Sequence, residues 1–185
     1  MSKFMIIIYP DSSNPNPHGL LDESLINQMY DLSDFVMSAI IPFRESAEEG
    51  YRRWREGYER NIASGAKYIL LLRDGILSGF LVFTCNYGGR DEIFINDLII
   101  HPKHQGDGAT LRNLVYHFLR EISDQAIPMI AVYVNEDNHR TQNLLRKAGF
   151  QVERRTENGM RYCMLRRQFL ERFDFLLERG GRVYS

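Results

Sequence analysis

Residues 98–110, Leu-Ile-Ile-His-Pro-Lys-His-Gln-Gly-Asp-Gly-Ala-Thr, combine residue types that suit the binding of a phosphate group. An apolar run ends at a proline, a loop with Gly106 and Gly108 follows, and apolar residues then recur with helical spacing. Glycines let a backbone approach an anion without a side chain in the way. The first turn of a helix presents unpaired N–H groups. The segment from Gln105 to Thr110 is therefore predicted to bind a phosphate or diphosphate.

The remaining elements follow from apolar periodicity, turn dipeptides and helix caps. Expected strands cover residues 3–9, 68–73, 76–86, 92–100, 128–134, 150–155 and 161–166, and expected helices cover about 25–40, 46–64, 108–122, 138–148 and 168–179. The order is β-α-α-β-β-β-α-β-α-β-β-α, which favours an α/β fold with a mixed sheet covered by helices on both faces. We expect one domain over residues 1–185, with Cys85 and Cys163 as core thiols.

Composition limits the classes of partner. Apolar residues make up 44% and charged residues 25% of the 185-residue chain, and the net charge is −1. This balance creates no field that would attract nucleic acid or an anionic membrane. No run approaches the roughly 20 apolar residues of a membrane span, and the first apolar run is too short for a signal peptide. We therefore expect a cytoplasmic protein with no nucleic-acid or membrane partner.

Two motifs together resemble the GNAT superfamily of acyl-CoA-dependent N-acyltransferases. The first, residues 97–110, resembles the strand and [Gln/Arg]-x-x-Gly-x-[Gly/Ala] loop of that family. The second, residues 135–150, resembles Asn-x-x-Ala-x-x-[Phe/Leu]-Tyr-x-[Lys/Arg]-x-Gly-Phe, beginning at Asn138. The resemblance spans about residues 3–166, so the final helix is an addition to the family's β-α-α-β-β-β-α-β-α-β-β core.

The resemblance implies acetyl-CoA as co-substrate and no metal. The diphosphate would lie on the loop that begins at Gln105, and the pantetheine arm would lie between two splayed strands, near Leu98 and Ile100. Lys103 or His104 is a candidate for the 3′-phosphate by proximity and charge. The cofactor-binding residues implied by the match are Leu98, Ile99, Ile100, Gln105, Gly106, Asp107, Gly108, Ala109, Thr110, Asn135, Asn138, Thr141 and Leu144.

Three positions depart from the family pattern. Thr110 replaces a smaller residue, and its hydroxyl is able to donate to a phosphate. Asp107 adds a negative charge that does not help to bind an anion. Leu145 stands where the family often has a tyrosine that protonates the CoA thiolate. Three interpretations follow from Leu145: the thiolate leaves with water as proton donor, Tyr133 substitutes for the tyrosine, or the domain binds acyl-CoA and catalyses little.

The acceptor ammonium must lose a proton before it attacks the thioester. The candidate bases are Asp97, preferred because it interrupts an apolar strand, and Glu92. Asn96 can orient a water molecule but is not a base. Strict alternation places Glu92, Phe94, Asn96 and Leu98 on one face of the strand, and Ile95, Asp97 and Ile99 on the other. A backbone N–H near Leu98 or Ile99 is expected to polarise the thioester carbonyl.

Other side chains carry weaker signals. Tyr51, Trp54 and Tyr58 form either a core stripe or part of an acceptor wall. The loop histidines His101 and His104 lack the further ligands that a metal site needs. The arginines at 154, 155, 161, 166 and 167 are interpreted as a solvated hairpin face rather than a nucleic-acid patch. The final helix is expected to pack on its own sheet.

The sequence thus favours an N-acetyltransferase that transfers an acetyl group from acetyl-CoA to a small-molecule or peptide amine by direct attack in a ternary complex. The alternatives are a non-catalytic acyl-CoA-binding or sensing module and an interaction protein that retains the fold. Monomer and homodimer both remain open.

Overall fold

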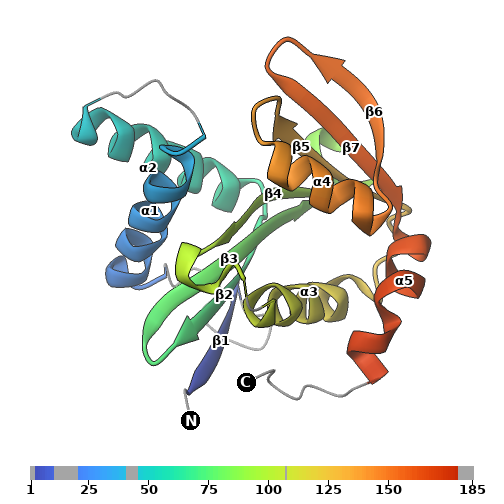
Figure 1. The fold of residues 1–185 in the computed structure, drawn as a ribbon, viewed down its shortest axis with the longest axis horizontal. Coiled ribbons are helices and arrows are strands. Elements are labelled where there is room, and N and C mark those ends of the chain that lie inside the picture. Colours follow the sequence, from blue (N-terminus) through green and yellow to red (C-terminus); the bar gives the residue numbers. More distant parts are fainter. Residues whose placement is uncertain (1–2, 11–20, 41–45, 107, 179–185) are drawn as a thin grey trace.

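The computed structural model describes residues 3–10, 21–40, 46–106 and 108–178. A seven-stranded sheet in the order β1-β2-β3-β4-β5-β7-β6 forms the centre of this part of the chain (Figure 1). The strands are β1 Phe4–Tyr9, β2 Lys67–Arg73, β3 Ile76–Cys85, β4 Glu92–Ile100, β5 Met129–Asn135, β6 Gln151–Thr156 and β7 Gly159–Leu165. The α-helices are α1 Glu23–Met37, α2 Ala47–Ala63, α3 Ala109–Ile122, α4 His139–Ala148 and α5 Arg166–Glu178. The predicted α/β fold with a mixed sheet is confirmed, and the predicted elements are all present with shifts of a few residues at their ends.

Helices cover both faces of the sheet, and each face has its own apolar core. On one face, α3, α4 and α5 pack on strand residues such as Ile93, Ile95 and Leu98. On the other face, α1 and α2 pack on strand residues such as Val82 and Ile99. Figure 1 shows α3 and α5 below and beside the sheet and α1 and α2 at its opposite side. We call these the cofactor face and the acceptor face.

Local signals explain several element ends. Asp74 and Gly75 both have positive φ, 53° and 82°, as a tight turn between β2 and β3 requires. Ser46 caps α2 by accepting from the Glu49 N–H, and Asn138 caps α4 by accepting from the Thr141 N–H. Gly149 ends α4 with a φ of 94°.

The two cysteines are free thiols. Both are only half-buried, so they lie at the margin of the core rather than within it, and burial raises the pKa of each thiol. The final helix packs on its own sheet as expected, because Phe169 and Leu176 are buried in the cofactor-face core. Among the described residues, no helix is long and apolar enough to span a membrane.

Candidate active site

The sheet opens between β4 and β5, which are the only parallel pair among the described strands. Their pairing runs from Glu92 and Met129 to Ile95 and Val132 and then stops. Beyond this point β5 stays paired with β7 as far as Asn135, and β4 stays paired with β3 as far as Ile100. The second half of β4 and the end of β5 therefore diverge, and each leaves backbone groups facing a gap.

The hydrogen-bond alternation identifies which backbone groups of β4 face this gap. The His101 N–H donates to the Ser78 carbonyl of the neighbouring antiparallel strand. Because hydrogen-bonding residues alternate along such a pair, the Ile99 N–H also faces β3, whereas Leu98 and Ile100 face the gap. The side-chain amide of Gln105 donates to the Ile100 carbonyl over 2.9 Å. The sequence offered the backbone N–H of Leu98 or of Ile99 to polarise the thioester carbonyl. The Leu98 N–H faces the gap, whereas the Ile99 N–H faces β3.

A β-bulge in β4 changes which side chains share a face. Val82 pairs with Asp97, but the next β3 residue, Phe83, pairs with Ile95, so Asn96 is an extra residue. A bulge shifts the alternation by one position. Leu98 consequently joins Ile93 and Ile95 on the cofactor face. The expected grouping of Asp97 with Ile95, and of Leu98 with Glu92, is therefore wrong.

Asp97 lies at this bulge, on the acceptor face with Ile99 and Val82. Protein atoms surround its carboxyl closely, and burial raises its pKa to about 6. Its side chain is nevertheless exposed to solvent.

Asn96 is held by a polar network on the same face. The Thr84 hydroxyl, buried on β3, donates to Oδ1 of Asn96 over 2.9 Å, and Nδ2 of Asn96 lies 3.4 Å from Oδ1 of Asn61 on α2. Asn61 also forms a side-chain hydrogen bond with buried Tyr68, whose pKa is raised by burial and whose hydroxyl donates to the Tyr58 carbonyl over 3.5 Å. The network fixes the bulge against α2. Thr84, Asn61 and Tyr68 gave no sequence signal, because their partners are distant in the chain.

Glu92 is positioned for structure rather than for proton transfer at the bulge. Its carboxylate pairs with Arg161 of β7, which also pairs with Glu153 of β6. Glu92 lies where β4 and β5 are still paired, five residues before Asp97. The arginine at 161 is therefore not part of a solvated face, and Arg166 is not either, because its guanidinium donates to the Ile127 and Ser123 carbonyls.

Tyr133 is the first β5 residue beyond the point where pairing with β4 ends. Its side chain is 42% exposed. Its hydroxyl lies 2.6 Å from the Thr156 hydroxyl, which itself donates to the Gly159 carbonyl over 3.2 Å. Because the Thr156 proton is used in that bond, the Tyr133 hydroxyl donates to Thr156. Tyr133 is thus near the gap, with its proton directed to the β6–β7 turn.

The predicted phosphate loop leads into α3. Gly108 has a φ of 68° and precedes the first turn, which has no side-chain cap. The first turn of a helix presents N–H groups that no intrahelical carbonyl accepts, so the start of α3 suits the binding of an anion. The guanidinium of Arg112 lies close to Gly108, 3.2 Å from the position of a Cβ there. Asp107 lies outside the described residues.

The start of α3 packs tightly on the sheet at Gly79. A Cβ at Gly79 would lie 2.8 Å from the Ile99 carbonyl oxygen and 3.0 Å from Cγ2 of Thr110. Thr110 is 1% exposed. Its side chain is thus buried against β3, and the expected role of its hydroxyl as a phosphate ligand is not supported.

Arg140 on α4 links the loop to the second motif. Its guanidinium donates to the side chain of Gln105 and lies 3.5 Å from the Gln105 carbonyl oxygen. Arg112 and Arg140 thus add positive charge beside the loop, where the sequence interpretation considered only Lys103 and His104.

The second motif joins the end of β5 to α4. Buried Gln142 donates to the carbonyls of Asn135 and Glu136. Asn138 and Thr141 form the cap of α4, so the side-chain oxygen of Asn138 is already used by the helix. Leu144 is 40% exposed, whereas Leu145 is 8% exposed and packs in the core. No hydroxyl is present at the position where the family often has tyrosine.

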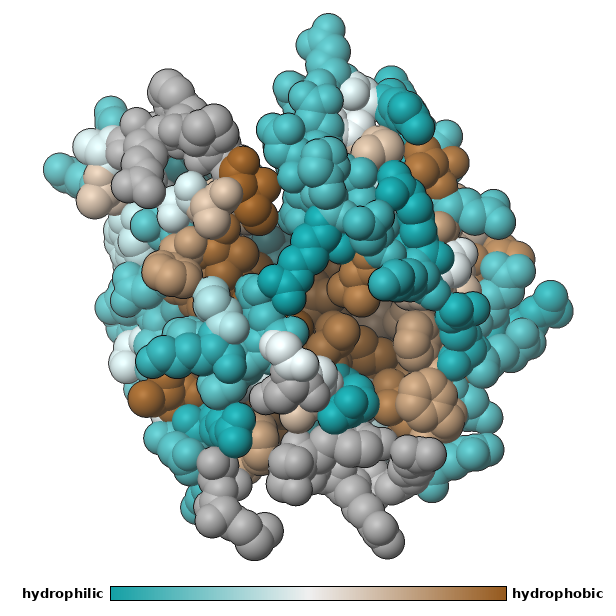
Figure 2. All heavy atoms as spheres, viewed as in Figure 1, coloured by the Kyte–Doolittle hydropathy of each residue, from teal (hydrophilic) through white to brown (hydrophobic). Residues whose placement is uncertain are grey.

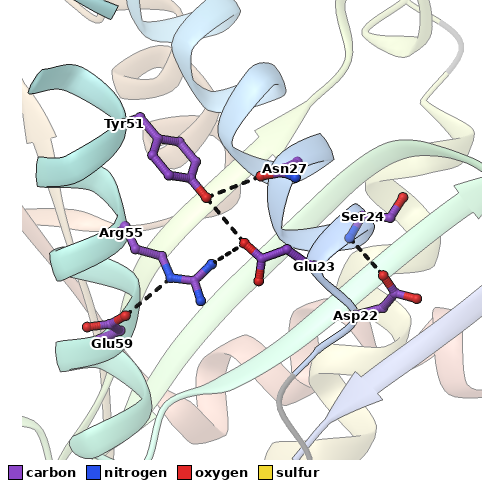
Figure 3. Close-up of polar contacts among 7 residues, drawn as sticks. All are labelled: Asp22, Glu23, Ser24, Asn27, Tyr51, Arg55 and Glu59. Atoms are coloured by element: carbon purple, nitrogen blue, oxygen red, sulfur yellow. Dashed lines mark hydrogen bonds and ion pairs between the residues drawn. The ribbon is translucent and has the colours of Figure 1, made fainter. Parts of the chain in front are cut away.

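The acceptor face is bounded by α1 and α2, which polar contacts hold together. Arg55 of α2 pairs with Glu23 of α1 at 2.8 Å and with Glu59 at 3.2 Å, and Tyr51 donates to Glu23 (Figure 3). Tyr58 is 3% exposed and stacks on Trp54, with ring centroids 5.8 Å apart. The stripe is therefore mainly a core stripe, as one of the two interpretations expected.

The histidines in the loop before α3 make local contacts. His101 accepts from the Lys103 N–H, and His104 lies 3.4 Å from the Arg73 guanidinium. Within the described part of the chain, no group of three or more His, Cys, Asp or Glu side chains is arranged to hold a metal ion.

A family model connects this geometry to known proteins. The model of the GNAT acetyltransferase family matches residues 27–150, which include the bulge, the phosphate loop and α4. The chain belongs to the GNAT family. It is therefore an acyl-CoA-dependent N-acyltransferase by membership, as the resemblance of the two motifs implied. A search of curated proteins found no match.

Solved structures share the GNAT fold with this chain. PaiA N-acetyltransferase from Thermoplasma acidophilum, in complex with coenzyme A, is 15% identical, with a TM-score of 0.65 over 87% of this chain and 99% of that one. A spermidine N-acetyltransferase SpeG chimera from Vibrio cholerae and hSSAT is 17% identical, with a TM-score of 0.62 over 91% and 99%. PseH from Campylobacter jejuni, in complex with acetyl coenzyme A, is 15% identical, with a TM-score of 0.55 over 88% and 99%.

Proposed function

We propose that this GNAT enzyme transfers an acetyl group from acetyl-CoA to a primary amine by direct attack in a ternary complex. One observation carries the proposal: the gap between β4 and β5 begins beside Asp97 and extends towards a helix start that is suited to a diphosphate. The three structural relatives named above include complexes with coenzyme A and acetyl coenzyme A.

In this proposal the cofactor lies along the gap. The N–H groups at the start of α3 bind the diphosphate, and Gly106 and Gly108 leave room for it. Arg112 and Arg140 add charge near it. The pantetheine amides pair with the free backbone edge of β4 at Leu98 and Ile100, as an added strand would.

The reaction needs an oxyanion donor and a base. The Leu98 N–H is directed into the gap beyond the bulge and is assigned to the thioester oxygen. The amine nitrogen attacks the carbonyl carbon, the C–S bond breaks, and CoA leaves as a thiolate. Asp97 takes the proton of the attacking amine. Its raised pKa makes it a better proton acceptor than an ordinary aspartate, while it stays mainly ionised at pH 7.

The thiolate requires no enzymatic acid in this account. A thiol has a pKa near 8.5, so the thiolate is a stable leaving group and takes its proton from water. Leu145 has no proton to give, and the Tyr133 hydroxyl already donates to Thr156. Direct attack of the amine needs no covalent intermediate, and we assign neither cysteine as a nucleophile, because burial raises the pKa of both thiols and disfavours their thiolates.

The acceptor enters from the acceptor face, between α2 and the β6–β7 hairpin. Figure 2 shows a notch between these two parts of the surface. A small amine is the acceptor class that we favour at Asp97, and a peptide amine is the second class that we consider. The SpeG chimera named above is a spermidine N-acetyltransferase, which supports a small amine. A cytoplasmic location and the choice between monomer and homodimer stay predictions from the sequence.

Leu145 supports a second candidate, an acyl-CoA-binding module with little turnover. Calorimetric titration with acetyl-CoA, followed by a thiol-release assay with a panel of amines, separates the two. The proposal expects binding in the micromolar range and turnover with at least one amine. Binding without turnover on any amine would favour the module, and no binding at millimolar acetyl-CoA would refute both.

A further inference from the structure

The β-bulge of β4 reverses the hydrogen-bonding pattern of this strand where the gap begins. Ahead of the bulge, the Glu92 carbonyl accepts from the Asn86 N–H over 2.8 Å, so the even-numbered residues of β4 face β3. After the bulge, the His101 N–H donates to the Ser78 carbonyl over 2.9 Å, so the odd-numbered residues face β3. Asn96, the extra residue, separates the two patterns.

This reversal places both groups that the proposed reaction uses. If the even-numbered pattern continued, the Leu98 N–H would face β3 instead of the gap. The side chain of Asp97 would then share a face with Ile93 and Ile95, which are buried in the cofactor-face core. The position of the oxyanion donor and that of the base therefore depend on one local feature of β4.

Both ends of the Asn96 side-chain amide are hydrogen-bonded. Thr84 of β3 is 2% exposed, and its hydroxyl donates to Oδ1 of Asn96 over 2.9 Å. Nδ2 of Asn96 donates to Oδ1 of Asn61 on α2 over 3.4 Å. The extra residue is thus attached to the neighbouring strand on one side and to a helix on the other.

Thr84 is the partner of Asn96 that the sheet itself positions. Its partner across the two strands is Phe94, two residues before Asn96, so the Thr84 hydroxyl reaches Asn96 as a diagonal neighbour. The surrounding layer is apolar and includes Val82 and Ile99. A hydrogen bond in such a layer is stronger than one in water and makes the local structure rigid. We therefore expect the Thr84 hydroxyl, more than the longer contact from α2, to restrict movement of the bulge.

We propose that Thr84 is a positioning residue of the acyl-transfer reaction and acts through Asn96. By holding the bulge, it directs the Leu98 N–H to the thioester oxygen and the Asp97 carboxyl to the attacking amine. This inference rests on the proposed function and adds to it a residue that touches neither substrate. A displacement of a reacting group by about 1 Å is enough to lower a rate about 100-fold. Loss of the Thr84 hydroxyl should therefore lower kcat, while acetyl-CoA, held mainly through its diphosphate, should still bind.

Two substitutions at position 84 separate the hydrogen bond from packing. Thr84→Val keeps the shape of the side chain and removes the hydroxyl, whereas Thr84→Ser keeps the hydroxyl and removes a methyl group. In a thiol-release assay with the best amine of a panel, Thr84→Val should lower kcat about 10- to 100-fold, and Thr84→Ser should stay within about threefold of the wild type. Calorimetry should show that both variants bind acetyl-CoA within about threefold of the wild-type affinity. A loss of kcat that is equal in the two variants, or absent in Thr84→Val, would overturn the proposal.

Amide hydrogen exchange of the unliganded protein gives a readout that does not depend on activity. The N–H groups of Asp97 and Ile99 face β3, and they should exchange about tenfold faster or more in Thr84→Val than in the wild type or in Thr84→Ser. Ser33→Ala is the matched control, because Ser33 is 6% exposed on α1 and its hydroxyl donates to the Met29 carbonyl, outside this network. It should leave kcat and both exchange rates unchanged.

The two measurements distinguish failure of this proposal from failure of the proposed function. Unchanged exchange at Asp97 and Ile99 in Thr84→Val would overturn the role of Thr84. Absence of turnover in the wild type with every amine would instead refute the proposed function, and the exchange rates would still decide whether Thr84 holds the bulge.

Discussion

Asp97→Asn provides the sharpest test of the chemistry. If Asp97 accepts the proton of the amine, its removal should lower kcat by about 10²- to 10⁴-fold, the usual contribution of a general base. The side chain is exposed to solvent, so the isosteric amide is expected to fit without a packing change. Acetyl-CoA affinity should change less than twofold, because Asp97 is not among the residues assigned to the cofactor.

The dependence of the rate on pH gives the size of the effect expected from Asp97. With a pKa of about 6, roughly one tenth of Asp97 is ionised at pH 5 and roughly nine tenths at pH 7. Ionisation of Asp97 should therefore multiply the rate about tenfold over this interval and add nothing above it. Deprotonation of the acceptor amine affects the rate of wild type and variant alike. The change of slope near pH 6 in the plot of rate against pH, which reports Asp97, should therefore disappear in Asp97→Asn.

Stability should change in the opposite sense to activity. A folded-state pKa raised above the unfolded value of about 3.9 means that ionisation costs folding free energy. The chain should lose stability from this group as the pH rises from about 4 to 6, and Asp97→Asn should remove that loss. Thermal melts across this range and thiol release with the best amine of a panel are the two measurements. A variant that keeps its full rate and the break at pH 6 would refute the role of Asp97.

Three further substitutions test the loop and the leaving group. Gly108→Val should abolish CoA binding by calorimetry, because it places a branched side chain at a φ of 68° in the phosphate cradle, and retained affinity would refute that placement. Gly79→Ala should lower the free energy of unfolding by about 1–3 kcal/mol and weaken CoA binding, because its Cβ would lie 2.8 Å from the Ile99 carbonyl oxygen. The control Gly57→Ala, whose Cβ would have no neighbour closer than 3.8 Å, should be neutral or stabilising. Equal melting temperatures for the two variants would contradict the close packing at Gly79. Tyr133→Phe should change kcat less than about threefold, because its proton goes to Thr156; a loss of a hundredfold or more would make Tyr133 the thiolate's proton donor.

Local signals in the sequence predicted much of the fold. Asp74-Gly75 specifies a tight turn, and Ser46, Asn138 and Gly149 act as helix caps over a few residues. The loop before α3 was recognised in the same way, because a helix start and its glycines are adjacent in the chain. Such features depend on neighbouring residues, so the sequence contains all the information they need.

The arrangement of the site depends on contacts between distant residues, and it was predicted less well. Nothing near Asn96 signals the bulge, which arises from the pairing with β3 and reverses the expected faces of β4. Glu92 looked like a candidate base until its partner was known, and Arg161 is 69 residues away. The close approach of Gly79 to the start of α3 likewise needs the folded sheet.

The central claim is that backbone amides at the start of α3 bind the diphosphate of coenzyme A, with the pantetheine arm along the free edge of β4. Amide ¹H–¹⁵N spectra recorded during a titration with CoA test this most directly. The account predicts large, saturable shifts at Gly108, Ala109 and Thr110, with smaller ones at Leu98 and Ile100. Saturation of the protein with CoA while these five signals stay in place would contradict it.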